Sequence, residues 1–364
     1  DIGAEPLPVL AAGVPCQNSG THSHYADNCP QGANKELMRY GQQGGIPMEE
    51  MPAYIQDVLD LIEYANGDAR RTVWGRKRAE AGHPKPFNLK YIGIGNEDMI
   101  TEVFEERFAM IYKAVREKHP EITVVGTVGP FYEGTDYAEG WRLATELGVP
   151  MVDEHYYVDP GWMIHNQDYY DRYDRTKSKV YLGEYAAHLP GRPNNIETAL
   201  AEALYLTSVE RNADVVHMAT YAPLFAHVEG WQWRPDLIWF DNLNSVRTCS
   251  YYVQQLYSHN KGTHVLPLTM DKKAVSGQEG QDGLFASAVW DKDEKACIVK
   301  IANTSDKAQP VSVTFNGLKK SDKLVEGKCI TLQSADLDKD NTVEHPNVIT
   351  PKESDVTIEG NVLN

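Results

Sequence analysis

Apolar runs alternate with helical patterns through the first 260 residues. Buried strands are predicted near residues 6–13, 91–95, 122–128, 149–157, 179–186 and 215–224. Amphipathic helices, with apolar positions three or four residues apart, are predicted near residues 48–66, 103–115, 137–147, 167–176, 196–212 and 248–258. Loops are expected at 14–47 and at the basic segment 70–86. Six strand and helix units in succession favour parallel strands covered by helices, as in a barrel or an open doubly wound sheet.

The pattern changes after residue 260. Short alternating strands, separated by Asp, Asn, Gly and Lys turns, are predicted around residues 265, 285–290, 296–301, 311–315 and 356–358. This texture is typical of a β-sandwich. We therefore predict an α/β catalytic domain at residues 1–260, followed by an all-β, jelly-roll-like sandwich at residues 261–364.

Two of the predicted strands end in a glutamate. Glu97 follows the apolar run Tyr91-Ile92-Gly93-Ile94, and Glu184 follows Val180-Tyr181-Leu182-Gly183. In a barrel of parallel strands, the carboxyl ends of the strands carry the catalytic side chains. Two carboxylates there are what glycoside cleavage requires, although Glu97 alone could simply cap the next helix.

Composition narrows the possible ligands. A formal net charge of −17 and the lack of a Lys/Arg-rich run exclude a nucleic-acid partner. No apolar run is long enough to cross a membrane and no signal peptide is present, so no membrane partner is expected. A nucleotide-binding G-x-G-x-x-G turn is also absent. Seven Trp and twenty Tyr offer many flat surfaces suited to sugar stacking, or to ordinary core packing.

The five cysteines do not form a metal-binding or disulfide pattern. They are scattered, odd in number and without a C-x-x-C spacing. Cys16 and Cys29 flank His22 and His24, but that segment is rich in Gly, Ser and Asn and is interpreted as a loop. We expect no metal site and no cofactor.

Several motifs occur in a familiar order. They are Gly95-Asn96-Glu97, Asp153-Glu154-His155-Tyr156-Tyr157, Leu182-Gly183-Glu184-Tyr185-Ala186, Ala222-Pro223-Leu224-Phe225, Trp233-Arg234-Pro235-Asp236-Leu237-Ile238-Trp239-Phe240 and Ser250-Tyr251-Tyr252-Val253-Gln254-Gln255. Over nearly the whole chain the sequence resembles the retaining α-L-arabinofuranosidases of glycoside hydrolase family fifty-one. The resemblance implies a (β/α)8 TIM-type barrel with the acid/base after strand four and the nucleophile after strand seven.

Counted in that way, residues 1–260 contain barrel strands three to eight, and strands one and two are missing. Six units cannot close an eight-stranded barrel. We therefore expect the chain to be a fragment, or one half of a processed protein whose second polypeptide supplies the N-terminal strands. The sandwich also looks clipped at its end.

The resemblance assigns Glu184 as nucleophile and Glu97 as acid/base. It implies that Asn96 bonds a sugar hydroxyl, and His155 and Tyr157, on one side of a strand, could orient Glu184. His155 could instead be a core histidine. Trp231 and Trp233 could form a stacking wall for the substrate or could be packing residues.

The implied activity is exo-acting release of terminal non-reducing α-L-arabinofuranosyl residues from arabinan- or arabinoxylan-type polysaccharides or oligosaccharides. Such hemicellulose degradation favours an extracellular or periplasmic location over the cytoplasm. Two alternatives remain open: an endo-acting glucanase or xylanase of the same clan, or a non-catalytic carbohydrate-binding fragment.

Overall fold

The computed structural model describes residues 3–15, 44–274, 283–319 and 323–364. The loop that contains Cys16, His22, His24 and Cys29 lies outside these residues. The chain divides into two compact units, which are described separately below. The first comprises Asp1–Tyr156, Asp174–Gly183 and Asp214–Ala219, and the second comprises Tyr157–Tyr173, Glu184–Ala213 and Thr220–Asn364. The expected domain boundary after residue 260 stays a prediction.

A six-stranded sheet follows the order of the sequence. Its strands are β1 (Val9–Leu10), β2 (Tyr91–Ile94), β3 (Thr123–Thr127), β4 (Met151–Val158), β5 (Lys179–Ala187) and β6 (Val216–Tyr221), each hydrogen-bonded to the next in the chain. Strands β1 to β4 pair in parallel. A doubly wound sheet reverses its strand order at a switch point, whereas a barrel does not. The sequential order therefore favours the barrel alternative.

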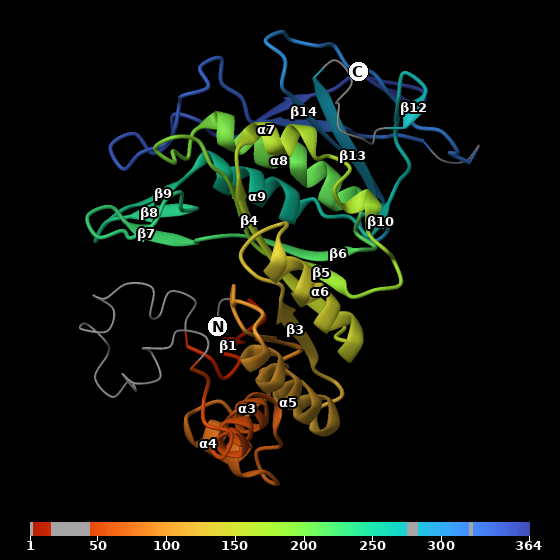
Figure 1. Ribbon diagram of the computed structural model, residues 1–364. Helices are drawn as coiled ribbons and strands as arrows, with labels where there is room; N and C mark the ends of the chain where they lie inside the picture. Colours follow the sequence, from red (N-terminus) through yellow and green to blue (C-terminus); the bar gives the residue numbers. More distant parts are fainter. Residues whose placement is uncertain (1–2, 16–43, 275–282, 320–322) are drawn as a thin grey trace. The chain divides into compact units, whose positions relative to one another are not determined.

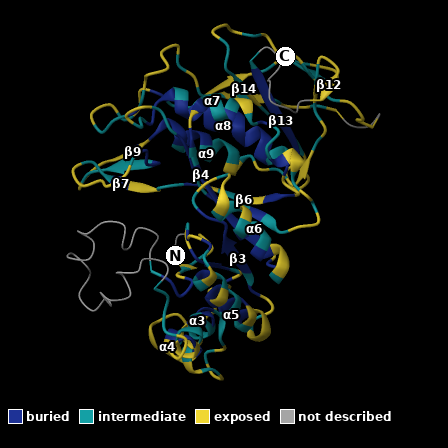
Figure 2. Cartoon of the chain, viewed as in Figure 1, coloured by how far each residue is buried: buried dark blue, intermediate teal, exposed yellow. Residues whose placement is uncertain are grey.

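Helices cover the strands of the first unit (Figure 1). They are α3 (Met51–Asn66), α4 (Val73–Glu80), α5 (Glu102–Lys118) and α6 (Thr135–Leu147). Helix α3 contacts α4 and α5, and α6 contacts β3. Helix α5 begins where the Thr101 side chain accepts a hydrogen bond from the Phe104 N–H. Its apolar residues are buried while its charged face stays exposed (Figure 2).

The second unit is built around α8 (Ile196–Arg211), which is buried along most of its length (Figure 2). Helix α8 contacts α7 (Pro160–His165), α9 (Cys249–His259) and strands β13 (Leu284–Asp291) and β14 (Ala296–Asn303). A helix that is covered on several sides needs apolar residues all round, and α8 supplies them with Ala, Leu, Ile and Val.

The C-terminal region is β-rich, as predicted. Strands β13 and β14 pair antiparallel over eight residues and continue to β10 (His264–Val265). The remaining strands form three small sheets: β11 (Thr269–Met270) with β12 (Lys273–Ala274), β16 (Lys328–Thr331) with β17 (Lys352–Asp355), and β15 (Val313–Thr314) with β19 (Val362–Leu363) and β18 (Ile358–Glu359).

Two expectations about local structure were wrong, and one small sheet was not predicted. The helix predicted at 167–176 is replaced by α7 and a short 3-10 helix, Tyr170–Arg172, because Asp159 caps a helix that starts with Pro160. The loop predicted at 70–86 contains α4, whose start is capped by Thr72. A small sheet, β7 (Phe225–His227), β8 (Ile238–Phe240) and β9 (Ser245–Arg247), precedes α9. In the part of the chain that the structure describes, no helix has the length and apolar character of a membrane span.

Candidate functional site

The loop after β2 holds Glu97 in an unusual backbone conformation. Gly95 has a φ of 84° and Glu97 a φ of 53°, both in the left-handed region. The Asn96 N–H donates to Asp98 Oδ2 at 2.8 Å, and the Glu97 N–H donates to Thr127 Oγ1, at the end of β3, at 3.0 Å. A non-glycine residue pays a conformational cost at such a φ, and these two hydrogen bonds offset it. The sharp turn places Glu97 at the carboxyl end of its strand.

Glu97 contacts an imidazole in the first unit. His155 Nδ1 lies 2.9 Å from Glu97 Oε1, and His155 Nε2 lies 3.1 Å from Asp153 Oδ2. The His155 side chain is 2% exposed and that of Glu97 is 14% exposed. Each short contact needs one proton, so the proton between His155 and Glu97 can belong to either group. This is the arrangement that a proton-exchanging carboxyl group requires.

Asp153 has room for its carboxyl because residue 183 is a glycine. A Cβ atom at Gly183 would collide with Asp153 Oδ1. The neighbouring carboxylate Glu154 is fully buried and accepts a hydrogen bond from Trp141 Nε1 at 3.1 Å. Asp153 thus contacts the His155 ring, whereas Glu154 bonds a tryptophan in the core.

Glu184 contacts a phenol hydroxyl in the second unit. It lies on β5, and its Oε2 accepts a hydrogen bond from the Tyr157 hydroxyl at 2.7 Å. Tyr157 in turn stacks on His188, with ring centroids 4.9 Å apart and planes inclined by 19°. The ring of Trp233 lies 5.4 Å from Tyr157 and 5.9 Å from His188. The rings of His188 and Trp233 therefore hold the Tyr157 ring, whose hydroxyl donates to Glu184, in position.

His188 enters this cluster as a neutral ring. Burial, and to a smaller extent the nearby Arg192 guanidinium, lower its pKa to about 4. The buried His188 Nε2 has no hydrogen-bond partner. His188 consequently adds aromatic surface, without adding charge, beside Tyr157.

The predicted site residues fall into two groups. Glu97, its neighbour Asn96, and His155 lie in the first unit, whereas Tyr157, Glu184, Trp231 and Trp233 lie in the second. Tyr157 contacts Glu184 as expected, but the ring of His155 contacts Glu97, a role not predicted. Asn96, Trp231 and Trp233 are exposed, and their roles toward a sugar stay predictions.

Sequence reasoning did not find Asp153, His188 or Arg192. Asp153 had a signal, because Asp153, His155 and Tyr157 alternate along β4 and therefore point to the same side. No sequence pattern indicated His188 or Arg192, because both lie in the loop after β5, where apolar and polar residues do not alternate regularly.

A third carboxyl group, Glu202 on α8, lies fully buried in the second unit. Its Oε1 accepts a hydrogen bond from the Ala187 N–H, at the end of β5, at 3.0 Å. Burial raises the pKa of Glu202 to about 8, against the opposing effect of that hydrogen bond. Glu202 is therefore mainly neutral at pH 7 and supports the strand that carries Glu184.

Comparisons with known proteins agree across the chain. The family model described as α-L-arabinofuranosidase C-terminal domain matches residues 167–364, and that described as α-L-arabinofuranosidase 1 domain matches residues 1–175.

Named relatives are considerably longer than this chain. An extracellular exo-α-L-arabinofuranosidase of Streptomyces chartreusis is 43% identical over 73% of this chain and 29% of its own length. The α-L-arabinofuranosidase 2 of Arabidopsis thaliana is 30% identical over 85% of this chain and 43% of its own. The chain thus spans less than half the length of either relative.

Solved structures share the fold. An arabinose-bound α-L-arabinofuranosidase, MgGH51, superimposes with a TM-score of 0.72 and 27% identity, over 87% of this chain and 50% of the other. The family 51 enzyme of Thermotoga petrophila gives a TM-score of 0.62 at 18% identity, over 98% and 87% of the two chains. These relatives consist of a TIM barrel and a C-terminal β domain, in line with the fold class predicted from the sequence.

Proposed function

Because this chain belongs to the α-L-arabinofuranosidases of glycoside hydrolase family 51, we propose that it hydrolyses terminal non-reducing α-L-arabinofuranosyl residues of arabinan- or arabinoxylan-type carbohydrates, with retention of configuration. Glu184 is the proposed nucleophile and Glu97 the proposed acid/base. The observation that carries this assignment is the difference between their partners. Glu184 accepts a hydrogen bond from the Tyr157 phenol, whereas Glu97 Oε1 lies 2.9 Å from a ring nitrogen of His155.

The first half of the proposed reaction uses both carboxyl groups. The Glu184 carboxylate attacks the anomeric carbon, and the bond from that carbon to the leaving oxygen breaks. Glu97 gives its proton to the leaving oxygen, so the product departs as an alcohol. Tyr157 keeps its hydrogen bond to Glu184 and so holds the attacking carboxylate in place.

The second half restores the starting state. Glu97, now a carboxylate, removes a proton from water, and the water oxygen attacks the anomeric carbon. The bond from that carbon to Glu184 breaks and releases arabinose with its original configuration. The pair His155 and Asp153 holds the Glu97 carboxyl group in one orientation through both proton transfers.

The exposed residues of each unit support contact with a sugar chain. Asn96 precedes the acid/base and has its side chain open to solvent, so it is proposed to bond a sugar hydroxyl. Trp231 and Trp233 are 47% and 38% exposed and are proposed as stacking surfaces. An exo-acting, extracellular or periplasmic role agrees with the description of the Streptomyces relative.

A complete barrel has eight strands, and the sheet formed by the residues that the structure describes has six. We propose that a second polypeptide, or sequence outside this chain, supplies the two further strands. Residues from those strands would complete the walls around the arabinose.

The test is hydrolysis of p-nitrophenyl α-L-arabinofuranoside by the purified protein, with an intact mass measured on the same sample. Turnover that is lost in both Glu184→Ala and Glu97→Ala, with retained configuration by NMR, is the expected result. Turnover that survives in Glu184→Ala would disprove the assignment. Sugar binding without any turnover in the unaltered protein would instead identify a carbohydrate-binding fragment.

A further inference from the structure

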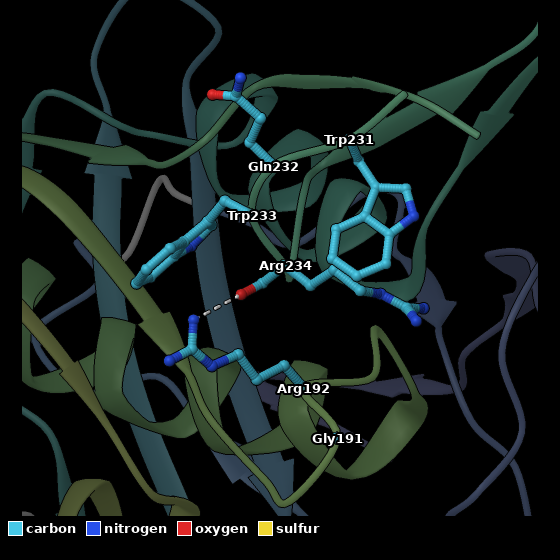
Figure 3. A pocket seen from close by; sticks show the side chains of 6 residues that line it. All are labelled: Gly191, Arg192, Trp231, Gln232, Trp233 and Arg234. Carbon is cyan, nitrogen blue, oxygen red and sulfur yellow. Dashed lines mark hydrogen bonds between the residues drawn. The ribbon is translucent and has the colours of Figure 1, made fainter. Parts of the chain in front are cut away.

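A hollow of about 320 Å³ opens on the surface of the second unit. It is lined by Gly191, Arg192, Trp231, Gln232, Trp233 and Arg234. Figure 3 shows the two indole rings on opposite sides of the hollow, with Arg192 below them. Both tryptophans are exposed although each could bury a large apolar area in the core. Exposed indoles that face a common space are typical of a surface that binds a ligand.

The hollow is positively charged within an acidic chain of net charge −17. The Arg192 guanidinium lies 4.2 Å from the centre of the Trp233 ring, and that of Arg234 lies 5.3 Å from the centre of the Trp231 ring. Arg192 Nη1 donates to the Arg234 carbonyl oxygen at 3.4 Å, which leaves most of its N–H donors available. Among the residues that the structure describes, no carboxylate lies within ion-pair distance of either guanidinium.

The acidic group nearest in sequence, Asp236, offsets the charge of Arg234. Asp236 is 2% exposed, and burial raises its pKa to about 6, although Arg234 acts in the opposite direction. The negative charge of Asp236 acts on Arg234. Arg192 is therefore the guanidinium that remains available to pair with a ligand. A guanidinium fork binds a carboxylate through two parallel hydrogen bonds, a geometry that a neutral sugar hydroxyl cannot match.

The hollow is also close to the proposed nucleophile within the same unit. Trp233 lines the hollow, and its ring contacts Tyr157, whose hydroxyl donates to Glu184. One aromatic ring thus separates the hollow from the residue that holds Glu184. A sugar bound there would belong to the chain that bears the arabinose.

We propose that this hollow binds a uronic acid residue of the arabinose-bearing polysaccharide. The apolar face of the sugar stacks on an indole, and its carboxylate pairs with Arg192. This inference rests on the proposed function, because it identifies the hollow as part of the site for that substrate.

The test uses calorimetric binding of two xylo-oligosaccharides of equal length, neither of which contains arabinose. One carries a single glucuronic acid and the other is neutral. We expect the acidic ligand to bind about tenfold more tightly, because it adds a charge-assisted pair of hydrogen bonds. The preference should shrink as the salt concentration rises. The Arg192→Gln variant should bind both ligands equally. Arg192→Lys, which keeps the charge but loses the fork, should retain only part of the preference.

The matched control is Arg76→Gln, on the exposed side of α4, which alters the net charge by the same amount. It should keep the full preference. Equal binding of the two ligands by the unaltered protein, or an unchanged preference in Arg192→Gln, would overturn the inference.

Turnover of p-nitrophenyl α-L-arabinofuranoside is measured separately on the unaltered protein. Turnover without any preference for the acidic ligand would disprove the uronic acid site and leave the proposed hydrolysis standing. A preference without turnover would disprove the proposed hydrolysis and leave a hollow that binds acidic sugars.

Discussion

Glu97 and Glu184 follow similar stretches of sequence but occupy contrasting surroundings. Glu97 lies in a turn beyond its strand, with its backbone held by Thr127 and its carboxyl beside His155. Glu184 lies within β5 in extended backbone, with its carboxyl beside Tyr157. An imidazole gives and takes protons near neutral pH, whereas a phenol remains a donor there. The chemistry of the partner therefore distinguishes a carboxyl that must exchange protons from one that must stay ionised.

The largest expected effect separates the two roles by leaving group. Glu184→Ala should lower kcat/KM by at least about 10⁴-fold on every arabinofuranoside, because the nucleophile is needed whatever departs. Glu97→Ala should lower it about 10²–10⁴-fold on an arabino-oligosaccharide, and far less on 2,4-dinitrophenyl α-L-arabinofuranoside, whose leaving group needs no proton. The control Glu80→Ala, on the surface of α4, should match the unaltered protein. Equal losses on both substrates in Glu97→Ala would contradict the comparison.

The next effect tests the phenol. Tyr157→Phe removes one hydrogen bond to a charged group, which contributes about 1.5–3 kcal/mol, so kcat should fall roughly 10- to 100-fold. The loss should be the same for good and poor leaving groups, since it acts on the nucleophile. Tyr64→Phe, which removes a hydroxyl from α3 in the first unit, is the control. An activity equal to that of the unaltered protein would show that the hydrogen bond has no role in the reaction.

A smaller effect tests the imidazole. His155→Gln should lower kcat/KM roughly tenfold on an arabino-oligosaccharide, because Gln supplies a donor but cannot exchange a proton with Glu97. The dinitrophenyl substrate should be nearly unaffected, and the basic limb of the pH profile should move. An identical loss on both substrates, with an unmoved pH profile, would reduce His155 to a packing residue.

The last effect is on stability and not on turnover, and it concerns Glu202, which shows what full burial does to a carboxyl group. Folded Glu202 keeps its proton up to about pH 8, whereas its ordinary pKa is 4.5, so the folded state binds the extra proton between these values. Stability should therefore fall as pH rises through this window. Glu202→Gln keeps an acceptor for the Ala187 N–H and removes this loss.

The variant should thus be more stable than the unaltered protein by roughly 4 kcal/mol at pH 8, and nearly equal to it near pH 4.5. Urea denaturation at the two pH values measures the difference. A gap that does not change with pH would mean that Glu202 is ionised in the folded state.

The sequence predicted the fold more completely than it predicted the site. Six apolar runs followed by helical patterns predicted six strands in the order of the sequence, and β1 to β4 pair in parallel as expected. The small sheet of β7 to β9 escaped prediction, since three-residue strands such as Ile238–Phe240 carry too few residues for a period. The helix expected at 167–176 failed because Asp159 and Pro160 start a helix earlier.

The two carboxylates could be placed at strand ends, but their partners could only partly be predicted. The alternation along β4 puts His155 and Tyr157 on the same side, yet it does not say which neighbour each one meets. That depends on the register of β4 with its neighbouring strands and on the turn at Glu97. Arg192 stacks on Trp233, and the two residues lie in loops about forty residues apart in the sequence. A pattern of neighbouring residues cannot predict such a contact.

The Asp153 carboxyl fills the space that a side chain at Gly183 would need, so positions 153 and 183 depend on each other. Any larger residue there would displace Asp153, and with it the ring that orients Glu97, although position 183 adjoins Glu184 in sequence. A substitution at position 183, next to Glu184, would therefore impair the acid/base step of Glu97 in activity assays. Among descendants of this sequence, Gly183 should vary only where position 153 has already become smaller. A library that randomises position 183 alone would return almost only glycine.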